Sequence, residues 1–408
     1  MKTLKLGVIL LTLLLAGMAM VPCVSAASDT EKVKILDVDH VTLPQLQFDA
    51  SQQEIILNDE LILMDPIETS QIKQSFISAK DGKSVKIPAG AIIHHSDKSV
   101  TTVFDSEGKQ LFAANDADAG IVFTPRGYKP ATFVCEIPSG SFVDAKESTI
   151  YISYNGKLIL TIIDNNKNKS TTTKSGTLAY NPTWREEYIE GAQSAALSNI
   201  GQFTANWNVP ASPRYLYVDP SNPTRRSQLA IWNGITTNDE SYLIQPVLEW
   251  AWKDRASSPE PGQVWTGASW FAYPGSSSTL HSTRISGIYP GDNIEGDMLF
   301  NHFNNYWTIT FRDTTRNIQT TYMTSQNAMP NTNVKIQIYL ETVSRASIPN
   351  NNYMCGDSTF TNFYLVNTNG QNVMPGTIGS GVNSVWTDLP GLSVGNSWPS
   401  RIILDTAN

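Results

Sequence analysis

Short apolar runs separated by polar turns follow one another along most of the chain. Their length and their two-residue alternation are typical of β-strands, and no long helical periodicity appears between them. The regular spacing of these runs over residues 183–408 predicts an all-β fold, with this segment forming one antiparallel β-sandwich. The predicted strands of this segment cover residues 201–209, 229–232, 242–248, 265–273, 292–300, 306–311 and 334–340.

The first half of the chain, residues 27–163, also reads as strands and predicts an N-terminal β-rich domain. Residues 149–154 and 157–163 are two apolar runs separated only by Asn155-Gly156. This dipeptide favours a type I′ turn, so the two runs predict a β-hairpin.

Residues 164–182 carry almost no apolar side chains before Leu178. A segment of this composition cannot bury enough apolar surface to offset the entropy of ordering it. We therefore expect an exposed linker between the two halves, and a site where proteases cut.

The first residues have the form of an export signal. Lys2 and Lys5 precede an apolar run at residues 8–21, and Val24-Ser25-Ala26 resembles a signal-peptidase site. The sequence predicts a secreted or extracellular protein, cleaved after Ala26. No later run approaches the roughly 20 apolar residues that a membrane span requires, so no membrane span is expected.

Charge and cysteine content narrow the classes of function. Only 16% of the residues are charged, the net charge is −8, and no cluster of Lys and Arg stands out. Nucleic-acid binding is therefore not expected. After removal of the signal, Cys135 and Cys355 remain, and a disulfide and two free buried thiols are equally compatible with the sequence.

Common catalytic motifs are missing from the sequence: it contains no H-E-x-x-H, G-x-S-x-G, P-loop or paired C-x-x-C. His94 and His95 are adjacent, and adjacent side chains on a strand point to opposite faces, so they do not predict a joint metal site. His281 and His302 have no evident Ser or Cys partner. No cofactor and no metal are expected, and carboxylates and amides remain as candidate chemistry.

The most informative residue is Gln245, a carboxamide within an apolar run that follows Trp232 and Gly234. Burying an amide without partners costs about 1–3 kcal/mol, which invites a functional explanation. Alternatively, its amide pairs with the backbone of neighbouring strands.

Five segments together resemble the glutamic peptidases of the eqolisin family. Residues 231–235 (IWNGI) and 243–245 (LIQ) are similar to the W-x-G-I-D and (I/L)-L-Q motifs, in the same order. Residues 203–210 (FTANWNVP), 268–274 (ASWFAYP) and 288–292 (IYPGD) match an opening strand, a later strand and a P-G-D turn. The resemblance implies a concanavalin A-like sandwich of two antiparallel sheets.

The same resemblance implies a catalytic pair of Gln245 and a glutamate on a neighbouring strand. Glu341 in residues 336–343 (IQIYLETV) is the best match, and Glu295 is a second choice. Strand alternation places Gln337, Tyr339 and Glu341 on one face.

Departures from the family pattern surround both residues of this pair. Thr342-Val343 stand where the family has Trp-Ile, Thr236 replaces an Asp, and Pro246 follows Gln245.

These residues predict a secreted acid endopeptidase acting on polypeptide substrates. Glu341 would serve as general base and acid, and the Gln245 amide would donate a hydrogen bond to the oxyanion. The residues expected to contact substrate are Trp232, Glu249, Trp270 and Tyr339.

The role of the N-terminal domain has two interpretations. It is either a propeptide that covers the cleft until the linker is cut, or a permanent accessory domain.

A second function, from another class, is a lectin-like module that binds carbohydrate without catalysis, for which the Asn-rich residues 301–306 and 350–353 would be suited. The position of Gln245 relative to Glu341 distinguishes the two functions.

Overall fold

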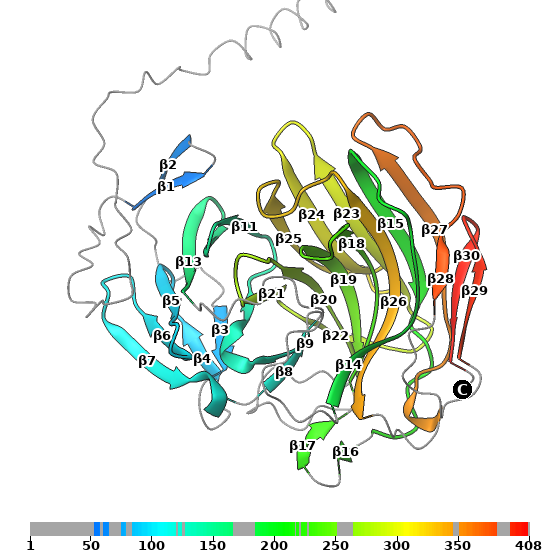
Figure 1. Cartoon of the computed structure of the whole chain (residues 1–408), viewed down its shortest axis with the longest axis horizontal. Helices are drawn as coiled ribbons and strands as arrows, with labels where there is room; N and C mark the ends of the chain where they lie inside the picture. The colour runs from blue at the N-terminus through cyan, green and yellow to red at the C-terminus, as the bar shows by residue number, and fades with distance from the viewer. Residues whose placement is uncertain are drawn as a thin grey trace, which may run out of the picture. The chain divides into compact units, whose positions relative to one another are not determined.

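The structure is a computed structural model (Figure 1). Every strand described below lies within residues 39–408. The signal peptide and most of the linker at 164–182 lie outside the described residues, which are 53–57, 60–64, 75–78, 84–119, 121–124, 127–165, 184–216, 218–219, 222–226, 228–250, 264–345, 351–381 and 392–406.

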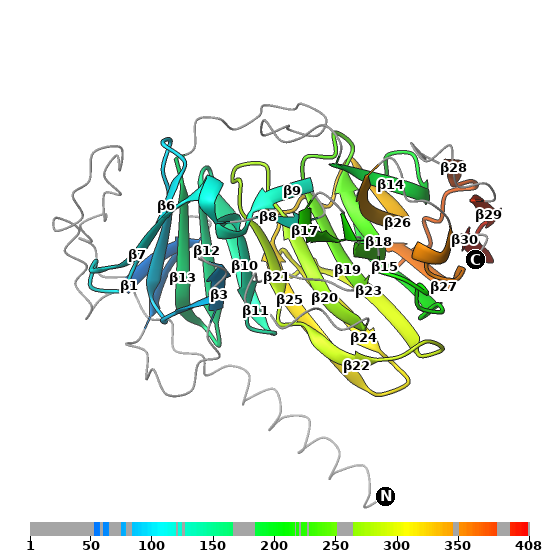
Figure 2. The ribbon, with the colours of Figure 1, turned by 90° about the horizontal axis from the view of Figure 1, so that it is seen from below.

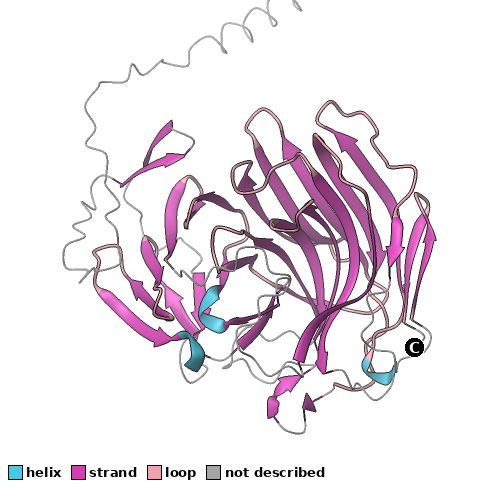
Figure 3. Ribbon diagram, in the orientation of Figure 1, coloured by secondary structure: helices cyan, strands magenta, loops and turns pink. Residues whose placement is uncertain are grey.

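Strands make up almost all of the regular structure (Figure 3). The helical elements of the described part are three short 3-10 segments, η4 (Asp116–Asp118), η5 (Ala131–Phe133) and η6 (Asn351–Tyr353). No helix in the described residues is long and apolar enough to cross a membrane. The predicted all-β fold is therefore confirmed, with two large sheets forming a sandwich.

The first large sheet has eleven strands. Its strands in spatial order are β28 (Gly379–Gly381), β14 (Trp184–Gln193), β26 (Val334–Arg345), β18 (Gln228–Thr237), β19 (Leu243–Trp250), β20 (Trp265–Ala272), β21 (Thr279–Ser282), β10 (Val134–Ile137), β3 (Ser75–Ser78) and β4 (Ser84–Ile87), with β22 (Ile285–Ile288) also paired to β20.

The second large sheet has thirteen strands. Their spatial order is β29 (Ser393–Ser397), β30 (Arg401–Asp405), β27 (Ser358–Asn367), β15 (Ile200–Asn208), β23 (Asn293–Asn301), β24 (Tyr306–Asp313), β25 (Ile318–Ser325), β11 (Ser141–Lys146), β12 (Thr149–Tyr154), β13 (Lys157–Asp164), β5 (Ala91–His95), β6 (Val100–Phe104) and β7 (Gln110–Asn115). Three two-stranded ribbons pair β1 (Gln53–Leu57) with β2 (Glu60–Met64), β8 (Ile121–Thr124) with β9 (Gly127–Pro130), and β16 (Val218–Asp219) with β17 (Asn222–Arg226).

Both large sheets run through the two halves of the sequence. β10 pairs in parallel with β21, and β11 pairs in parallel with β25, so strands that precede the linker extend sheets built by strands that follow it. Within residues 184–406 the described strands pair antiparallel, as predicted. The parallel pairings make the complete sheets mixed, which the sequence did not indicate.

The space between the two sheets holds the main hydrophobic core. Trp207 and Phe311 of the thirteen-stranded sheet share this core with Trp265 and Phe271 of the eleven-stranded sheet, and each is at most 2% exposed. Burying large aromatic side chains removes the most apolar area per residue, which explains why most tryptophans are internal.

The predicted hairpin at 149–163 is present as β12 and β13. Asn155 and Gly156 have φ angles of +52° and +74°, the left-handed values that a type I′ turn requires. Cys135 and Cys355 are buried free thiols, which decides between the two alternatives left by the sequence.

Candidate functional site

Gln245 lies in the middle of β19 and is fully buried. Neither its amide oxygen nor its amide nitrogen has a hydrogen-bond partner in the structure. Pro246 follows it and has no N–H with which to continue the ladder to the next strand. The alternative in which the amide pairs with strand backbone is therefore not observed.

Gln245 belongs to the face of the eleven-stranded sheet that points away from the sandwich core. On this face it pairs across to Trp270 of β20, while Trp232 of β18 pairs with Val247 and with Tyr339. Trp232, Val247 and Trp270 form a second, separate hydrophobic cluster. Alternate residues of the same strands point into the main core, so the predicted division of β26 into two faces is confirmed.

Glu341 is on the same face, but the expectation that it lies on a strand next to Gln245 is wrong. β18 runs between β19 and β26, as Figure 2 shows. Glu341 pairs with Ala230, whereas the register of β18 and β19 sets Gln245 opposite Gly234, four residues further along. Their Cα atoms are therefore two strand spacings apart across the sheet and four residues apart along it, which is about 16 Å in all. This distance is too long for the two side chains to bind one shared water.

Glu341 and Glu249, two carboxylates of this face, each accept a hydrogen bond from a tryptophan. The Trp232 indole N–H donates to Glu341 Oε2 at 2.7 Å, and the Trp270 indole N–H donates to Glu249 Oε1 at 2.5 Å. Arg284 forms an ion pair of 2.5 Å with Glu249, which is fully buried. These partners stabilise the Glu249 carboxylate, since burying a carboxylate without partners would be strongly unfavourable.

Tyr339 lies beside Trp232, with ring centroids 5.2 Å apart. Burial, reinforced by the negative charges of Glu240 and Glu341, raises the pKa of Tyr339 to about 12, so the phenol stays protonated. Gly191 of β14 makes room for this ring, since an added Cβ would lie 2.0 Å from Tyr339 Cδ1. The predicted substrate contacts are therefore gathered on one face.

Residues from before the linker cover this face. Val122 of β8, Ala131 of η5 and Val134 of β10 belong to the same buried cluster as Trp232 and Trp270. Figure 2 shows the β8–β9 hairpin in front of the sheet that contains β19 and β20. This cluster buries the Trp232 and Trp270 side chains, and Gln245 on the same face is also fully buried.

A buried polar network joins β5 and the end of β13 to the segment that precedes β21. His95 of β5 contacts Thr101 through Nδ1 at 2.7 Å and Ser278 through Nε2 at 2.9 Å. Burial lowers the pKa of His95 to about 3, against the attraction of Asp164. Asp164 in turn accepts from the Ser276 hydroxyl at 3.2 Å. Residues before and after the linker thus share one network.

Several other candidates have partners elsewhere. Glu295 lies on β23 in the other large sheet, where Arg312 pairs with it at 2.8 Å, so it cannot replace Glu341. His281 is buried with its ring 4.6 Å from that of Trp270, and the His302 ring is tilted against that of Phe303, with centroids 3.9 Å apart. Among the described residues, no group of three or more His, Cys, Asp or Glu side chains is arranged to hold a metal ion.

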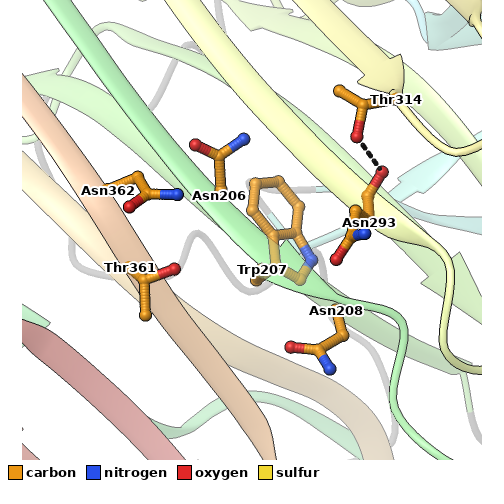
Figure 4. A pocket seen from close by; sticks show the side chains of 7 residues that line it. All are labelled: Asn206, Trp207, Asn208, Asn293, Thr314, Thr361 and Asn362. Carbon is orange, nitrogen blue, oxygen red and sulfur yellow. Dashed lines mark hydrogen bonds between the residues drawn. The ribbon is translucent and has the colours of Figure 1, made fainter.

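A polar pocket of about 320 Å³ opens on the thirteen-stranded sheet (Figure 4). Four of the seven residues that line it are asparagines, and Thr314 donates to the Asn293 carbonyl at 3.0 Å. Its one aromatic residue, Trp207, is 2% exposed and packs on Phe360 in the core. The pocket therefore offers no exposed ring on which a sugar could stack.

Comparison with known proteins gives similarity at the level of solved structures. No family model matches the chain, and no curated protein matches it. Scytalido-glutamic peptidase, bound to a peptide-based transition-state analogue, is similar with a TM-score of 0.36 and 14% identity over 55% of this chain and 98% of its own.

Two further structures are also similar. SCP-B, a member of the eqolisin family in complex with the tripeptide Ala-Ile-His, gives a TM-score of 0.35 and 14% identity over 55% of this chain and 98% of its own. A CBM2 module of the evolved Dit protein of Lactobacillus casei BL23 phage J-1 gives 0.26 and 8% identity, over 38% of this chain and 62% of its own.

Two participants in the site were not singled out from the sequence. Strand alternation predicts the face on which Gln337 lies but assigns it no role. In the structure Gln337 pairs with Gly234, the residue opposite Gln245. Arg284 carries no sequence signal, because its pairing with Glu249 depends on β22 lying against β20. For Gln337, the available sequence signal is its spacing from Glu341, which places both residues on one face of the strand.

Proposed function

We propose that this exported protein binds an extended polypeptide on the Gln245 face, and that its own N-terminal segment holds this face closed. The observation that carries the proposal is the fully buried Gln245 amide, which has no hydrogen-bond partner. A peptide group offers one donor and one acceptor, the complement of a carboxamide. A bound strand would remove the cost of about 1–3 kcal/mol that the unpaired amide imposes.

The covering segment explains how such a face is kept from solvent. Val122 and Ala131 provide apolar contacts to the cluster around Trp232, so the closed form buries the aromatic floor. Exposed apolar patches of this kind attract other chains, which gives closure a protective role. Binding then requires that the β8–β9 hairpin moves away.

Binding is tested with a permanently unfolded probe, fluorescein-labelled S-carboxymethylated α-lactalbumin, and the full-length protein. Val122→Asp should open the face by placing a carboxylate in the apolar cluster, while Leu111→Asp changes an exposed position of the same segment. We expect the open variant to bind at least about tenfold more tightly than Leu111→Asp or wild type at pH 7, because the open state is more populated. Near-ultraviolet circular dichroism checks that both variants are folded. A folded Val122→Asp protein without affinity for the probe at pH 4 and pH 7 refutes the proposal.

The Gln245 amide has its own test. Gln245→Met keeps the length of the side chain and removes its hydrogen-bonding groups, and Gln319→Met is the control on an exposed strand position. In the open variant, Gln245→Met should weaken probe binding. In the wild-type background it should leave the free energy of unfolding unchanged or higher, because an unpaired buried amide is lost. Loss of stability by more than about 1 kcal/mol would instead assign the amide a structural role.

A second candidate is acid-dependent hydrolysis of the bound polypeptide by Gln245 and Glu341, which share one face. Because about 16 Å separate their Cα atoms in the closed form, this reaction requires the two side chains to approach each other when the face opens. Glu341 would act as base and acid, and Gln245 as oxyanion donor. The open variant should then digest the probe at roughly pH 3 to 5, and Gln245→Ala should slow it by about 10²-fold or more. Equal digestion by open protein carrying Glu341→Gln removes Glu341 from this role.

A further inference from the structure

The row of residues that crosses the sheet at Gln245 contains a second amide. Gln337 of β26 pairs with Gly234 of β18, and the register of β18 with β19 sets Gly234 opposite Gln245. Glycine leaves this position without a side chain of its own. The two glutamines therefore stand on either side of one narrow lane, with Cα atoms about 10 Å apart, or two strand spacings.

The floor of this lane is the ring of Trp232. A Cβ built on Gly234 would lie 2.8 Å from Trp232 Cζ3 and 3.2 Å from Gln245 Cβ. The indole thus leans over the glycine, and its N–H points away to Glu341. A flat apolar floor between two amides matches an extended peptide, whose groups alternate between apolar side chains and hydrogen-bonding backbone.

Gln337 itself is well placed to contact a bound chain. It is 7% exposed, and the hydrogen bond of its side chain is a long one of 3.4 Å from Nε2 to Gln193 Oε1. Its carbonyl oxygen and second N–H are available in this geometry. The carboxylate of this row, Glu136, lies on β10, three strands away from Gln245. Glu341 lies four residues further along β26, and Glu249 is paired with Arg284.

We infer that Gln337 and Gln245 clamp one peptide group of a bound polypeptide, and that the amide at position 337 makes the face a binding site without hydrolysis. This inference rests on the proposed binding function. A carboxylate at this position would be close enough to Gln245 to act on the same peptide bond, whereas Glu341 is not in this geometry. The protein would then be converted from a binder to a hydrolase by one substitution.

The reaction expected of the Gln337→Glu variant balances without further reagents. The carboxylate introduced at position 337 takes a proton from water as the water oxygen bonds to the peptide carbonyl carbon, and the Gln245 N–H group stabilises the resulting oxyanion. The carboxylic acid then returns the proton to the peptide nitrogen as the C–N bond breaks. One water is consumed, and a new carboxyl group and a new amine are released.

The experiment compares full-length proteins in the Val122→Asp background, with the same labelled probe. Gln337→Met should weaken probe binding at least about threefold, and Gln337→Glu should release labelled fragments at pH 4 at least about tenfold faster than the parent. Adding Gln245→Met to Gln337→Glu should abolish that gain. Gln319→Glu is the matched control on the other sheet, and should change neither readout.

The outcomes separate the two proposals. If the parent does not bind the probe at all, the proposed function fails, whatever Gln337 does. If the parent binds and Gln337→Met binds equally well, the clamp is wrong while the binding function stands. If the parent already releases fragments as fast as the Gln337→Glu variant, the face is hydrolytic without a carboxylate at this position, and the inference is overturned.

Discussion

Glu190 on β14 gives the most direct quantitative prediction. Its side chain is fully buried, and neither carboxyl oxygen makes a well-formed hydrogen bond in the structure. Burial raises the pKa of Glu190 from 4.5 to about 9, with Asp405 and Asp357 adding to the shift and the backbone of Asp405 opposing part of it. The folded protein therefore keeps this proton at neutral pH.

The sign of the linkage follows from the raised pKa. Between pH 4.5 and about 9, the unfolded chain releases the Glu190 proton and the folded chain retains it, so stability falls as pH rises through this window. At pH 7.5 this titration lowers the free energy of unfolding by about three pKa units, or about 4 kcal/mol at roughly 1.36 kcal/mol per unit. Below pH 4.5 the penalty is gone.

Glu190→Gln removes the titration while keeping shape and volume. We expect this variant to be more stable than wild type by about 3–4 kcal/mol at pH 7.5, and equal to it within about 1 kcal/mol at pH 4. Urea unfolding followed by tryptophan fluorescence at both pH values measures the difference, with the exposed Glu107→Gln as control. A Glu190→Gln protein whose advantage is the same at pH 4 and pH 7.5 contradicts the reasoning.

Three other changes probe the site and its surroundings. Because the pKa of His95 is lowered from 6.5 to about 3, its contribution to stability is lost as pH falls through this window, and His95→Gln should flatten that part of a pH series of urea midpoints. Gly267→Ala places a Cβ 2.0 Å from Phe311 Cε1 and should lower the free energy of unfolding by at least about 1–3 kcal/mol, visible as a lower melting temperature. Trp270→Phe removes the indole donor to Glu249 and should cost about 1–3 kcal/mol in urea unfolding, and an unchanged midpoint would show that Glu249 does not need it.

The strands could be predicted from the sequence because the signals that indicate them are local. Alternation assigned Tyr339 and Glu341 to one face, and Asn155-Gly156 defined a turn whose φ angles are those of the expected geometry. Each of these depends on residues that are close in sequence.

The order of the strands in space was harder to predict from the sequence. Nothing near Gln245 or Glu341 indicates that β18 separates their strands, and the offset of four residues emerges only from two registers taken together. The parallel pairing of β10 with β21 joins residues more than 140 positions apart. Such long-range choices depend on the packing of whole sheets, which a single sequence does not display.

The two parallel junctions have a consequence for proteolysis. Hydrolysis within residues 166–183 would break the chain but leave β10 bonded to β21 and β11 bonded to β25. The two fragments of such a nicked molecule stay bound to each other, as complementing fragments do. Departure of the N-terminal piece would uncover the edges of β21 and β25, and unpaired edges of this kind are prone to join other strands. Nicking and release are therefore separate events, and gel filtration of nicked protein under native conditions should still show a single species of full mass.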